Sequence, residues 1–383
     1  MGLQSYKFEA FWNITIYLFK HNKLRDAKES INQLLKSKNI SFEYKVKYMW
    51  LSTNISFANH EYKTTISELD NLADIIKESN NTVLHNGRNL LSIVYFDKAR
   101  SHLKINEPEI AFDLFEKMVN LPLSNSLIEK SKLIKANYFG SNNRLDKALK
   151  ILIGIADNYI EKENAIIALH ESSIYLERLG QHQHLIQSIN ILKRLINEFP
   201  NSDTILYAKI RLINIYQKLE EFHIALNLCN EIISSQKSSN NKLLYKVLLV
   251  QNDCMHALAH NNKRKLQEVF ENYSSIRTKY PDVHDLNLEI LYKQSIILKK
   301  LGEYEKQKLL LYSEVIQKFL NNDNNISLNT NALHWISRSM FQLIYIFEND
   351  GDLHKVHNIY RKMILHQLPG YKIAKKQLEM YNK

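Results

Sequence analysis

The amino-acid sequence predicts an all-α protein, an α-solenoid of about nine antiparallel helix pairs with a C-terminal capping helix. The 383 residues include only 8 glycines and 5 prolines, and so few helix breakers favour helix throughout. Apolar residues recur at positions i, i+3, i+4 and i+7, whereas alternating runs of Val, Ile and Thr between Gly-rich turns are absent. The few breakers fall between the periodic stretches and so divide the chain at regular intervals.

Taken in order, the periodic stretches predict helix pairs along the whole of residues 1–383, which we expect to form a single solenoid. The pairs cover residues 6–37, 42–78, 84–120, 127–158, 163–198, 203–235, 242–279, 286–320 and 329–366. Pro108 is expected at the first turn of a helix, where its missing N–H leaves no helical hydrogen bond unmade. A last helix over residues 371–382 should cap the array, with Ile373 and Leu378 facing inward.

The corner between the two helices of a pair has a recurring composition. An apolar or aromatic residue follows the turn, and a small or aliphatic residue comes three positions later. The first set is Leu24, Tyr62, Leu145, Phe222, Tyr304 and Leu353, and the second is Ala27, Thr65, Ala148, Ala225 and Val356, with Gln307 as the departure. We interpret the large residue as a plug between the antiparallel helices and the small one as their point of close approach. Gly180, Gly302 and Gly351 stand at three of the turns, where a left-handed residue can end a helix.

Spacings of about 37 to 40 residues between the clearer corners lie in the range of helix-pair repeats. The stretch "NEFPNSDTILYAKIRLINIYQKLEEFHIAL" resembles the tetratricopeptide-repeat family. Tyr216, Phe222 and Ala225 match the aromatic residue of the family's first helix, its turn aromatic and the alanine of its second helix. Pro200 and Pro281 match the proline that closes a repeat.

The resemblance implies a TPR-like superhelix in which the first helix of each pair lines a concave surface. The sequence departs from the family in repeat length and in lacking most of the first-helix glycine, and the corner at residues 261–264 has no aromatic plug. The added length before "FPNS" is similar to repeats of bacterial envelope proteins that assemble the outer membrane or coordinate cell-wall synthesis. That likeness favours a bacterial scaffold.

The formal charge of +11 and the pI near 9.2 describe a basic protein. The excess of Lys and Arg lies at the two ends, in residues 1–50 and 351–383. A solvated basic surface explains it without a ligand, and contact with an acidic partner or anionic lipid is the alternative. Nucleic acid is not expected as a partner, because no basic stripe carries interleaved aromatic residues or Gly-rich segments.

The compartment follows only weakly from the sequence. Cys229 and Cys254 lie in apolar helical patterns and are expected as buried free thiols. No run of 18 apolar residues predicts a membrane span, and the first residues lack the basic start and cleavage site of a signal peptide. The chain as written is therefore expected in the cytoplasm, and in the periplasm if a signal sequence has been removed.

Motifs that bind cofactors or carry out catalysis are missing from the sequence. Phosphate loops, GxGxxG, paired CxxC and HExxH do not occur, and the glycines fall at turns. His354 and His357 beside Asp352 have workable metal spacing, but without a third ligand a solvated helix face explains them better. We therefore expect no catalytic residue, no metal, no cofactor and no enzymatic activity.

Aligning the pairs on their corners predicts a binding surface on the first helices. Rings recur at one first-helix position, amides follow one turn later, and lysines stand near the helix ends, where they could hold an acidic tail. The candidate residues are Trp12, Trp50, Asn54, Phe96, Asn137, Asn214, Lys218, Tyr292 and Phe341. Rings supply contact area and amides bond a peptide backbone. Each ring taken singly is more often part of a core than of a contact.

Two functions fit these observations. The first is a non-catalytic protein–protein interaction scaffold or adaptor in a bacterial envelope or secretion assembly, with a partner peptide or helix on the concave face. The alternative is a regulatory receptor for a short signalling peptide. No helix-turn-helix that reads DNA precedes the repeats, which lowers the second function relative to the first.

Overall fold

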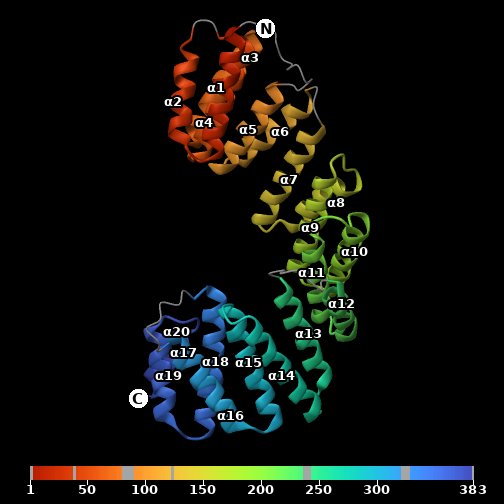
Figure 1. Cartoon of the computed structure of the whole chain (residues 1–383), viewed down its shortest axis with the longest axis vertical. Coiled ribbons are helices and arrows are strands. Elements are labelled where there is room, and N and C mark those ends of the chain that lie inside the picture. The colour runs from red at the N-terminus through yellow and green to blue at the C-terminus, as the bar shows by residue number, and fades with distance from the viewer. Residues whose placement is uncertain are drawn as a thin grey trace. The chain divides into compact units, whose positions relative to one another are not determined.

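The computed structural model describes residues 3–37, 40–79, 90–121, 125–235, 243–320 and 328–381, and all regular structure within these ranges is helical (Figure 1). The helices follow one another as the expected antiparallel pairs and a last single helix, so the all-α solenoid fold class is confirmed. They form two compact units, Met1–Thr204 and Ile205–Lys383, called unit 1 and unit 2 below. Residues 84–89 of the third predicted pair, residue 242 of the seventh and residue 382 of the predicted cap lie outside the described residues.

Unit 1 contains five pairs, each made of a first helix and a second helix. They are α1 Leu3–Lys20 with α2 Leu24–Leu35, α3 Phe42–Ala58 with α4 Tyr62–Glu78, α5 Leu90–Lys104 with α6 Pro108–Val119, α7 Asn125–Ser141 with α8 Leu145–Asp157, and α9 Lys162–Leu179 with α10 His182–Glu198. Pro108 is the first residue of its helix, as predicted. Successive first helices contact one another, α3 and α5 through the hydrogen bond of Trp50 to Asp97.

Unit 2 contains the remaining pairs and the cap. They are α11 Ile205–Lys218 with α12 Phe222–Ser235, α13 Leu244–Ala259 with α14 Lys263–Lys279, α15 His284–Leu301 with the second helix formed by α16 Tyr304–Leu309, η1 Leu310–Gln317 and α17 Lys318–Leu320, α18 Thr330–Asn349 with α19 Leu353–Leu365, and the cap α20 Tyr371–Tyr381. Cys229 and Cys254 are buried and free, and burial raises the pKa of their thiols to about 12 and about 11.

Every corner between paired helices holds one residue in the left-handed region of φ. In unit 1 φ lies between 57° and 69°, and in unit 2 between 47° and 81°. These residues are Asn22, His60, Asn106, Asn143 and Gly180, followed by Glu220, His260, Gly302 and Gly351. In most corners the next N–H donates to the carbonyl five residues back, as Glu221 does to Tyr216 over 2.9 Å. This bond satisfies a helix-end carbonyl and fixes the turn.

The position three residues into the second helix is buried in every pair. Its occupants are Ala27, Thr65, Ala111, Ala148, Leu185, Ala225, Leu266, Gln307 and Val356. The interpretation of these residues as points of close approach therefore agrees with their burial. The plug interpretation fails in part, because Tyr304 is 55% exposed and Leu353 46% exposed. A residue at the first position of a second helix can point outward, because the buried residue three positions later already fills the corner.

Gln307 is the exception among the buried corner residues. Its side chain is fully buried, and neither amide atom has a hydrogen-bond partner within the described ranges. The second helix becomes π-helical from Leu310. A π-helical turn is wider than an α-helical one. This pair therefore combines a buried amide without a partner among the described residues with a second helix that departs from α-helical geometry.

The contact between α7 and α9 depends on a glycine. A Cβ atom on Gly140 would lie 2.3 Å from the ring of Tyr175, a distance that real side chains do not reach. Tyr175 is buried, and its hydroxyl donates to Asn137 Oδ1 over 3.3 Å. Gly140 thus provides close approach within a helix and does not act as a turn residue.

The C-terminal helix α20 packs by residues other than those predicted. Ala374 is fully buried and Leu378 packs against the core of unit 2, but Ile373 is 58% exposed. The inward orientation predicted for Ile373 is therefore wrong. Gly370 precedes α20 at φ 87°, and a Cβ there would lie 2.9 Å from the Phe341 ring. With Gly370 against Phe341 and Ala374 in the core, α20 packs on α19 in a register that leaves Ile373 exposed.

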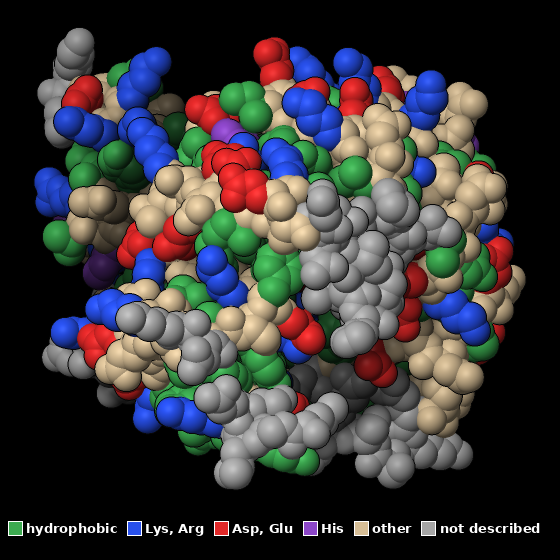
Figure 2. Space-filling model, turned by 90° about the horizontal axis from the view of Figure 1, so that it is seen from above, with side chains coloured by type: hydrophobic (Ala, Val, Ile, Leu, Met, Phe, Trp, Pro, Cys, Tyr) green, Lys and Arg blue, Asp and Glu red, His purple; other side chains and the backbone are tan. Residues whose placement is uncertain are grey.

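Lysine and arginine side chains do not form a single patch on the face drawn in Figure 2, where they stand among aspartate and glutamate side chains. The formal charge of +11 is therefore not expressed there as a field of one sign. Local ion pairing, and not net charge, decides what a given part of this surface can attract.

Candidate functional site

A cavity of about 570 Å³ in unit 1 is lined mainly by successive first helices. Trp12 comes from α1, Trp50 from α3 and Phe96 from α5, and these three residues belong to the surface predicted from the sequence. The remaining apolar lining is Val46, Leu72, Ile76, Leu90, Ile93, Val94 and Leu127. We call this cavity the tryptophan groove.

Trp50 is held in place by a carboxylate of the next first helix. Its Nε1–H donates to Asp97 Oδ2 over 2.9 Å, and Arg100 donates to Asp97 Oδ1 over 3.2 Å. The Asp97 side chain is only 14% exposed, and burial raises the pKa of its carboxyl group although both contacts oppose the rise. The guanidinium of Arg100 lies 4.8 Å from the Phe57 ring centre. Asp97, which lines the groove, therefore accepts hydrogen bonds from both the Trp50 indole and the Arg100 guanidinium.

Trp12 rests on a buried tyrosine. The rings of Trp12 and Tyr48 meet edge to face with their centroids 5.7 Å apart. Tyr48 is fully buried, and its hydroxyl donates to the Phe8 carbonyl over 2.7 Å. Burial, with a smaller contribution from Tyr44, raises the pKa of Tyr48 to about 12. Because Tyr48 is fixed by both packing and a hydrogen bond, the Trp12 ring has a defined seat.

Charged side chains of both signs border the groove. Lys47 of α3 pairs with Glu43 over 2.7 Å, whereas Lys130 of α7 is exposed. Glu161, directly before α9, is half-buried. With Asp97 inside, the groove presents one carboxylate among rings and aliphatic side chains, and polar groups lie at its border. This arrangement suits a ligand that is apolar at its centre and polar around it.

The other predicted site residues lie outside this groove. Asn54 donates its amide to the carbonyl of Trp50 on its own helix over 2.8 Å, so that amide is turned to its own backbone. Asn137 is exposed and accepts from Tyr175, and Asn214 is half-buried on α11. Lys218 is exposed at the end of α11.

Two predicted rings belong to unit 2. Phe341 packs partly buried against the core and faces Gly370. Tyr292 of α15 lies against Trp335 of α18, with ring centroids 5.5 Å apart and ring planes tilted by 40°. Aligning the helix pairs on their corners did not select Trp335, although its ring lies beside that of Tyr292, which was selected.

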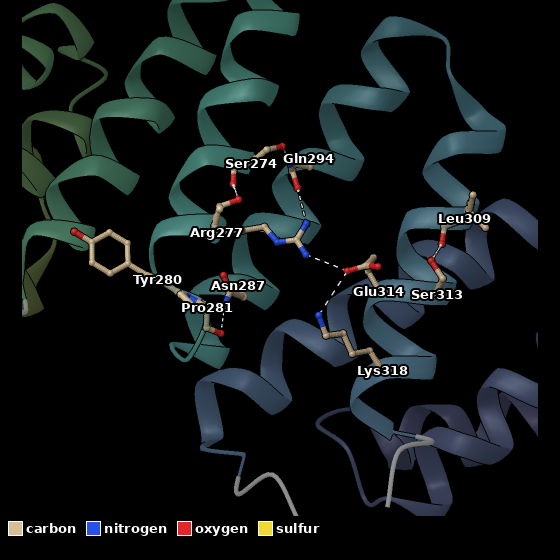
Figure 3. Close-up of polar contacts among 11 residues, drawn as sticks. Ser274, Arg277, Tyr280, Pro281, Asn287, Gln294, Leu309, Ser313, Glu314 and Lys318 are labelled. Carbon is tan, nitrogen blue, oxygen red and sulfur yellow. Dashed lines mark hydrogen bonds and ion pairs between the residues drawn. The ribbon is translucent and has the colours of Figure 1, made fainter. Parts of the chain in front are cut away.

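A second cavity, of about 330 Å³, lies in unit 2 and was not predicted. Arg277 of α14 lines it and donates to Gln294 over 3.4 Å and to Glu314 over 3.1 Å (Figure 3). Asn287 donates to the carbonyls of Tyr280 and Pro281 over 3.1 and 2.8 Å. These bonds join α14, α15 and η1 and fix the turn at Pro281. The polar side chains of Arg277 and Asn287 therefore have a structural role.

The described part of the chain offers no metal site or membrane-spanning helix. No group of three or more His, Cys, Asp or Glu residues there is placed to hold a metal ion. Asp352 instead caps α19 by accepting from the Lys355 N–H, and it pairs with the Lys355 ammonium over 2.7 Å. None of the described helices is both long enough and apolar enough to cross a bilayer.

Paired helices closed by left-handed corners, with a buried residue three positions into each second helix, define a tetratricopeptide-repeat-like α-solenoid. No protein-family model matches the sequence, and no curated protein was found to match it. Several solved structures are similar to this chain. The apo form of RapI is 11% identical, with 97% of this chain and 98% of that chain covered and a TM-score of 0.50.

Two further solved structures are similar at lower scores. The apo quorum sensor NprR from B. thuringiensis is 16% identical, covering 81% of this chain and 86% of that chain at a TM-score of 0.43. A putative kinesin light chain with TPR-like repeats from Podosopora anserina is 11% identical, covering 52% of this chain and 100% of that chain at a TM-score of 0.42. At these identities the likeness concerns the fold alone.

Proposed function

We propose that this protein is a non-catalytic scaffold that binds a segment of another protein in the tryptophan groove. The observation that carries the proposal is the presentation of Trp12, Trp50 and Phe96 by three consecutive first helices around one cavity. Tryptophan is enriched among the residues that dominate binding energy at protein interfaces. Because Tyr48 and Asp97 already hold the two indoles, little ordering would accompany binding.

The lining also defines the chemistry of the partner segment. The apolar wall suits one or two bulky apolar side chains, since the groove of about 570 Å³ lies in the usual range of ligand pockets. Asp97 is a buried acceptor within that wall, so a partner N–H or cation beside the apolar anchor would be favoured over a carboxylate. The proposed ligand is therefore a peptide or helix with an apolar anchor flanked by a donor.

The proposed cellular setting is a bacterial envelope or secretion assembly, and it is supported by the resemblance of the stretch before Pro200 to envelope-protein repeats. A photocrosslinking residue in place of Lys130 on the groove border tests this setting in cells. Mass spectrometry should identify envelope or secretion proteins among those crosslinked. Recovery of crosslinked proteins from other assemblies only would contradict the setting and leave the groove proposal standing.

Peptide selection against the full chain tests the groove itself. Peptides selected from a displayed random library should contain a bulky apolar residue next to a basic or amide one. Of the 3 tryptophans, two lie in the groove, so a Trp335→Phe variant makes tryptophan emission a report on groove occupancy. We expect the selected peptide to shift that emission, and Trp50→Ala to weaken its binding about 30-fold.

The matched control is Tyr17→Ala, which removes a ring of α1 that is 57% exposed and does not line the groove. Tyr17→Ala should bind the selected peptide as the unaltered chain does. Circular dichroism of each variant checks that helix content is retained. If peptides bind Trp12→Ala and Trp50→Ala within about twofold of the unaltered chain, the groove assignment is wrong.

A further inference from the structure

A second set of aromatic residues, in unit 2, holds an arginine with no acidic partner. The guanidinium carbon of Arg338 on α18 lies 4.7 Å from the ring centre of Tyr292 on α15 and 5.2 Å from that of Trp335. Arg338 is exposed, and no carboxylate among the described residues forms an ion pair with it. The rings orient the flat guanidinium, while its N–H donors stay open to solvent.

The arrangement repeats two helical turns further along with the roles of the helices exchanged. Here Lys299 of α15 supplies the cation, and its ammonium lies 5.1 Å from the ring centre of Tyr345 on α18. Lys299 is exposed and, like Arg338, forms no ion pair among the described residues, while Tyr345 is 52% exposed. Seven residues separate Tyr292 from Lys299 on α15 and Arg338 from Tyr345 on α18, so the two cation–ring pairs are about 10 Å apart along the helix axes.

Four carboxylates in this part of unit 2 are already engaged, two by each of two lysines. Asp253 and Glu289 both bind Lys293, over 2.7 and 2.5 Å. Near the other end, Glu305 and Asp350 both bind Lys308, over 2.5 and 2.9 Å. Among the described residues, these carboxylates are bound to Lys293 and Lys308, whereas Arg338 and Lys299 form no ion pair.

We propose that the Arg338–Lys299 surface binds the side-chain carboxylates of an extended acidic segment of another protein. In the extended polyproline II conformation, with three residues per turn and a rise of about 3.1 Å per residue, acidic residues three positions apart lie on one face about 9 Å apart and can meet both cations. Arg338 can hold one carboxylate with two parallel N–H donors, and Lys299 holds the other as a point charge. The surface selects against basic and purely apolar segments.

This surface goes beyond the tryptophan groove and does not depend on it, since its residues come from unit 2 and the groove from unit 1. The two sites also prefer opposite chemistry. The groove contains the carboxylate of Asp97 and favours a donor, whereas the Arg338–Lys299 surface offers donors and favours carboxylates.

Labelled peptides in a Gly-Ser host test the proposal on the full chain by fluorescence anisotropy. One peptide carries two Glu residues three positions apart, a second carries them at adjacent positions, and a third carries Gln in their place. We expect the first peptide to bind most tightly and the Gln peptide most weakly. Arg338→Gln should weaken binding of the first peptide about tenfold, and Arg338→Lys should recover only part of that loss.

The control for simple loss of charge is Arg194→Gln in unit 1, where the arginine pairs with Asp157 and Glu198 over 2.6 and 2.8 Å. That variant removes the same charge and should bind the first peptide unchanged. Trp50→Ala should also leave this binding unchanged, which separates the outcome from that of the groove. Equal loss in Arg338→Gln and Arg194→Gln, equal affinity for the Glu and Gln peptides, or no binding at low salt would each overturn the proposal.

Discussion

Units 1 and 2 use the same helix-pair frame but present different first-helix surfaces. In unit 1 the first helices α1, α3 and α5 supply rings and aliphatic side chains around one nearly buried carboxylate, Asp97. In unit 2 the first helices α13, α15 and α18 supply ion pairs and cations stacked on rings. The frame itself is similar in both, because every corner uses a left-handed residue and a buried position in the second helix.

The difference shows that fold and recognition depend on separate positions of the repeat. Corner positions decide whether two helices pair, and first-helix surface positions are free to vary once the pair has formed. Unit 2 nevertheless carries the less regular frame. Gln307 is buried without a partner for its amide, and a π-helix follows it. Changing one corner or contact in each unit therefore tests which positions fix the frame.

The largest effect is expected at the close helix contact of unit 1. Gly140→Ala places a Cβ atom against Tyr175, and overpacking of this kind destabilises by about 1–3 kcal/mol. Thermal and urea unfolding followed by circular dichroism should show the loss. Gly154→Ala is the matched control, since no atom lies within 4 Å of a Cβ there. It should stabilise α8 by about 0.5–1 kcal/mol, because alanine is the better helix former.

A second substitution tests that Gly140→Ala acts through the ring. Tyr175→Leu removes the aromatic atoms that the new Cβ would meet. The double variant should therefore be less destabilised than the sum of the two single variants predicts. Additive losses would show that Tyr175 is not the group that makes glycine necessary.

The next effect is expected at the irregular corner of unit 2. Gln307→Met keeps an unbranched side chain of similar length and removes an amide that has no partner. A buried amide without hydrogen bonds costs about 1–3 kcal/mol, so the variant should be more stable by an amount of that order. Urea unfolding of the variant and the unaltered chain measures the difference.

The complementary change places the amide in a regular corner. Ala225→Gln puts the same side chain at the equivalent position of the α11–α12 pair, where alanine is fully buried. It should destabilise unit 2 through both overpacking and the buried amide. If Gln307→Met lowers stability instead, the Gln307 amide is bonded to ordered water and is not a defect of the corner.

A smaller effect is expected at a left-handed residue. Glu220 stands at φ 61°, a conformation that glycine adopts without steric penalty. Glu220→Gly should stabilise the α11–α12 corner by about 0.5–1 kcal/mol. In unit 1 the equivalent Asn143, at φ 58°, tolerates this region better, so Asn143→Gly should gain less. Equal gains at the two positions, measured by urea unfolding, would contradict the difference between the units.

The corners show how much the sequence could predict. Helix periodicity and the recurring corner residues predicted the pairs, because burial of one stripe per helix is a local pattern. Glycine predicted the left-handed turn only at positions such as Gly180 and Gly302. Asn, His and Glu adopt the same conformation elsewhere, as at Glu220, because the hydrogen bond that closes the corner offsets the strain.

The candidate sites were less predictable because they depend on which side chain meets which across helices. The corner alignment pointed to Trp12, Trp50 and Phe96, which line one cavity. The alignment could not predict the contact of Asp97 with Trp50 or that of Arg338 with Tyr292. The two residues of each contact are more than 40 positions apart in sequence. The predicted role of the marked residues in binding stays a prediction, and the proposed experiments test it.

The smallest effect is expected from the buried carboxylate of the groove. Burial raises the pKa of Asp97 above that of an unfolded chain, so its ionised form is less favourable in the folded state. The stability that Asp97 contributes is therefore present at low pH and is lost as pH rises through the folded-state pKa. Asp97→Asn removes this dependence and keeps an oxygen that can accept from Trp50.

Unfolding of both proteins should be compared from about pH 4 to pH 8. The free energy of unfolding of Asp97→Asn should rise relative to the unaltered chain as pH increases. Asp113→Asn is the control, since it removes an exposed carboxylate of α6 that pairs with Lys117 over 2.6 Å. A relative change of the opposite sign for Asp97→Asn would mean that the Arg100 and Trp50 contacts outweigh burial. The groove would then hold a stably ionised acid, and its preference for a partner cation would be stronger than burial alone predicts.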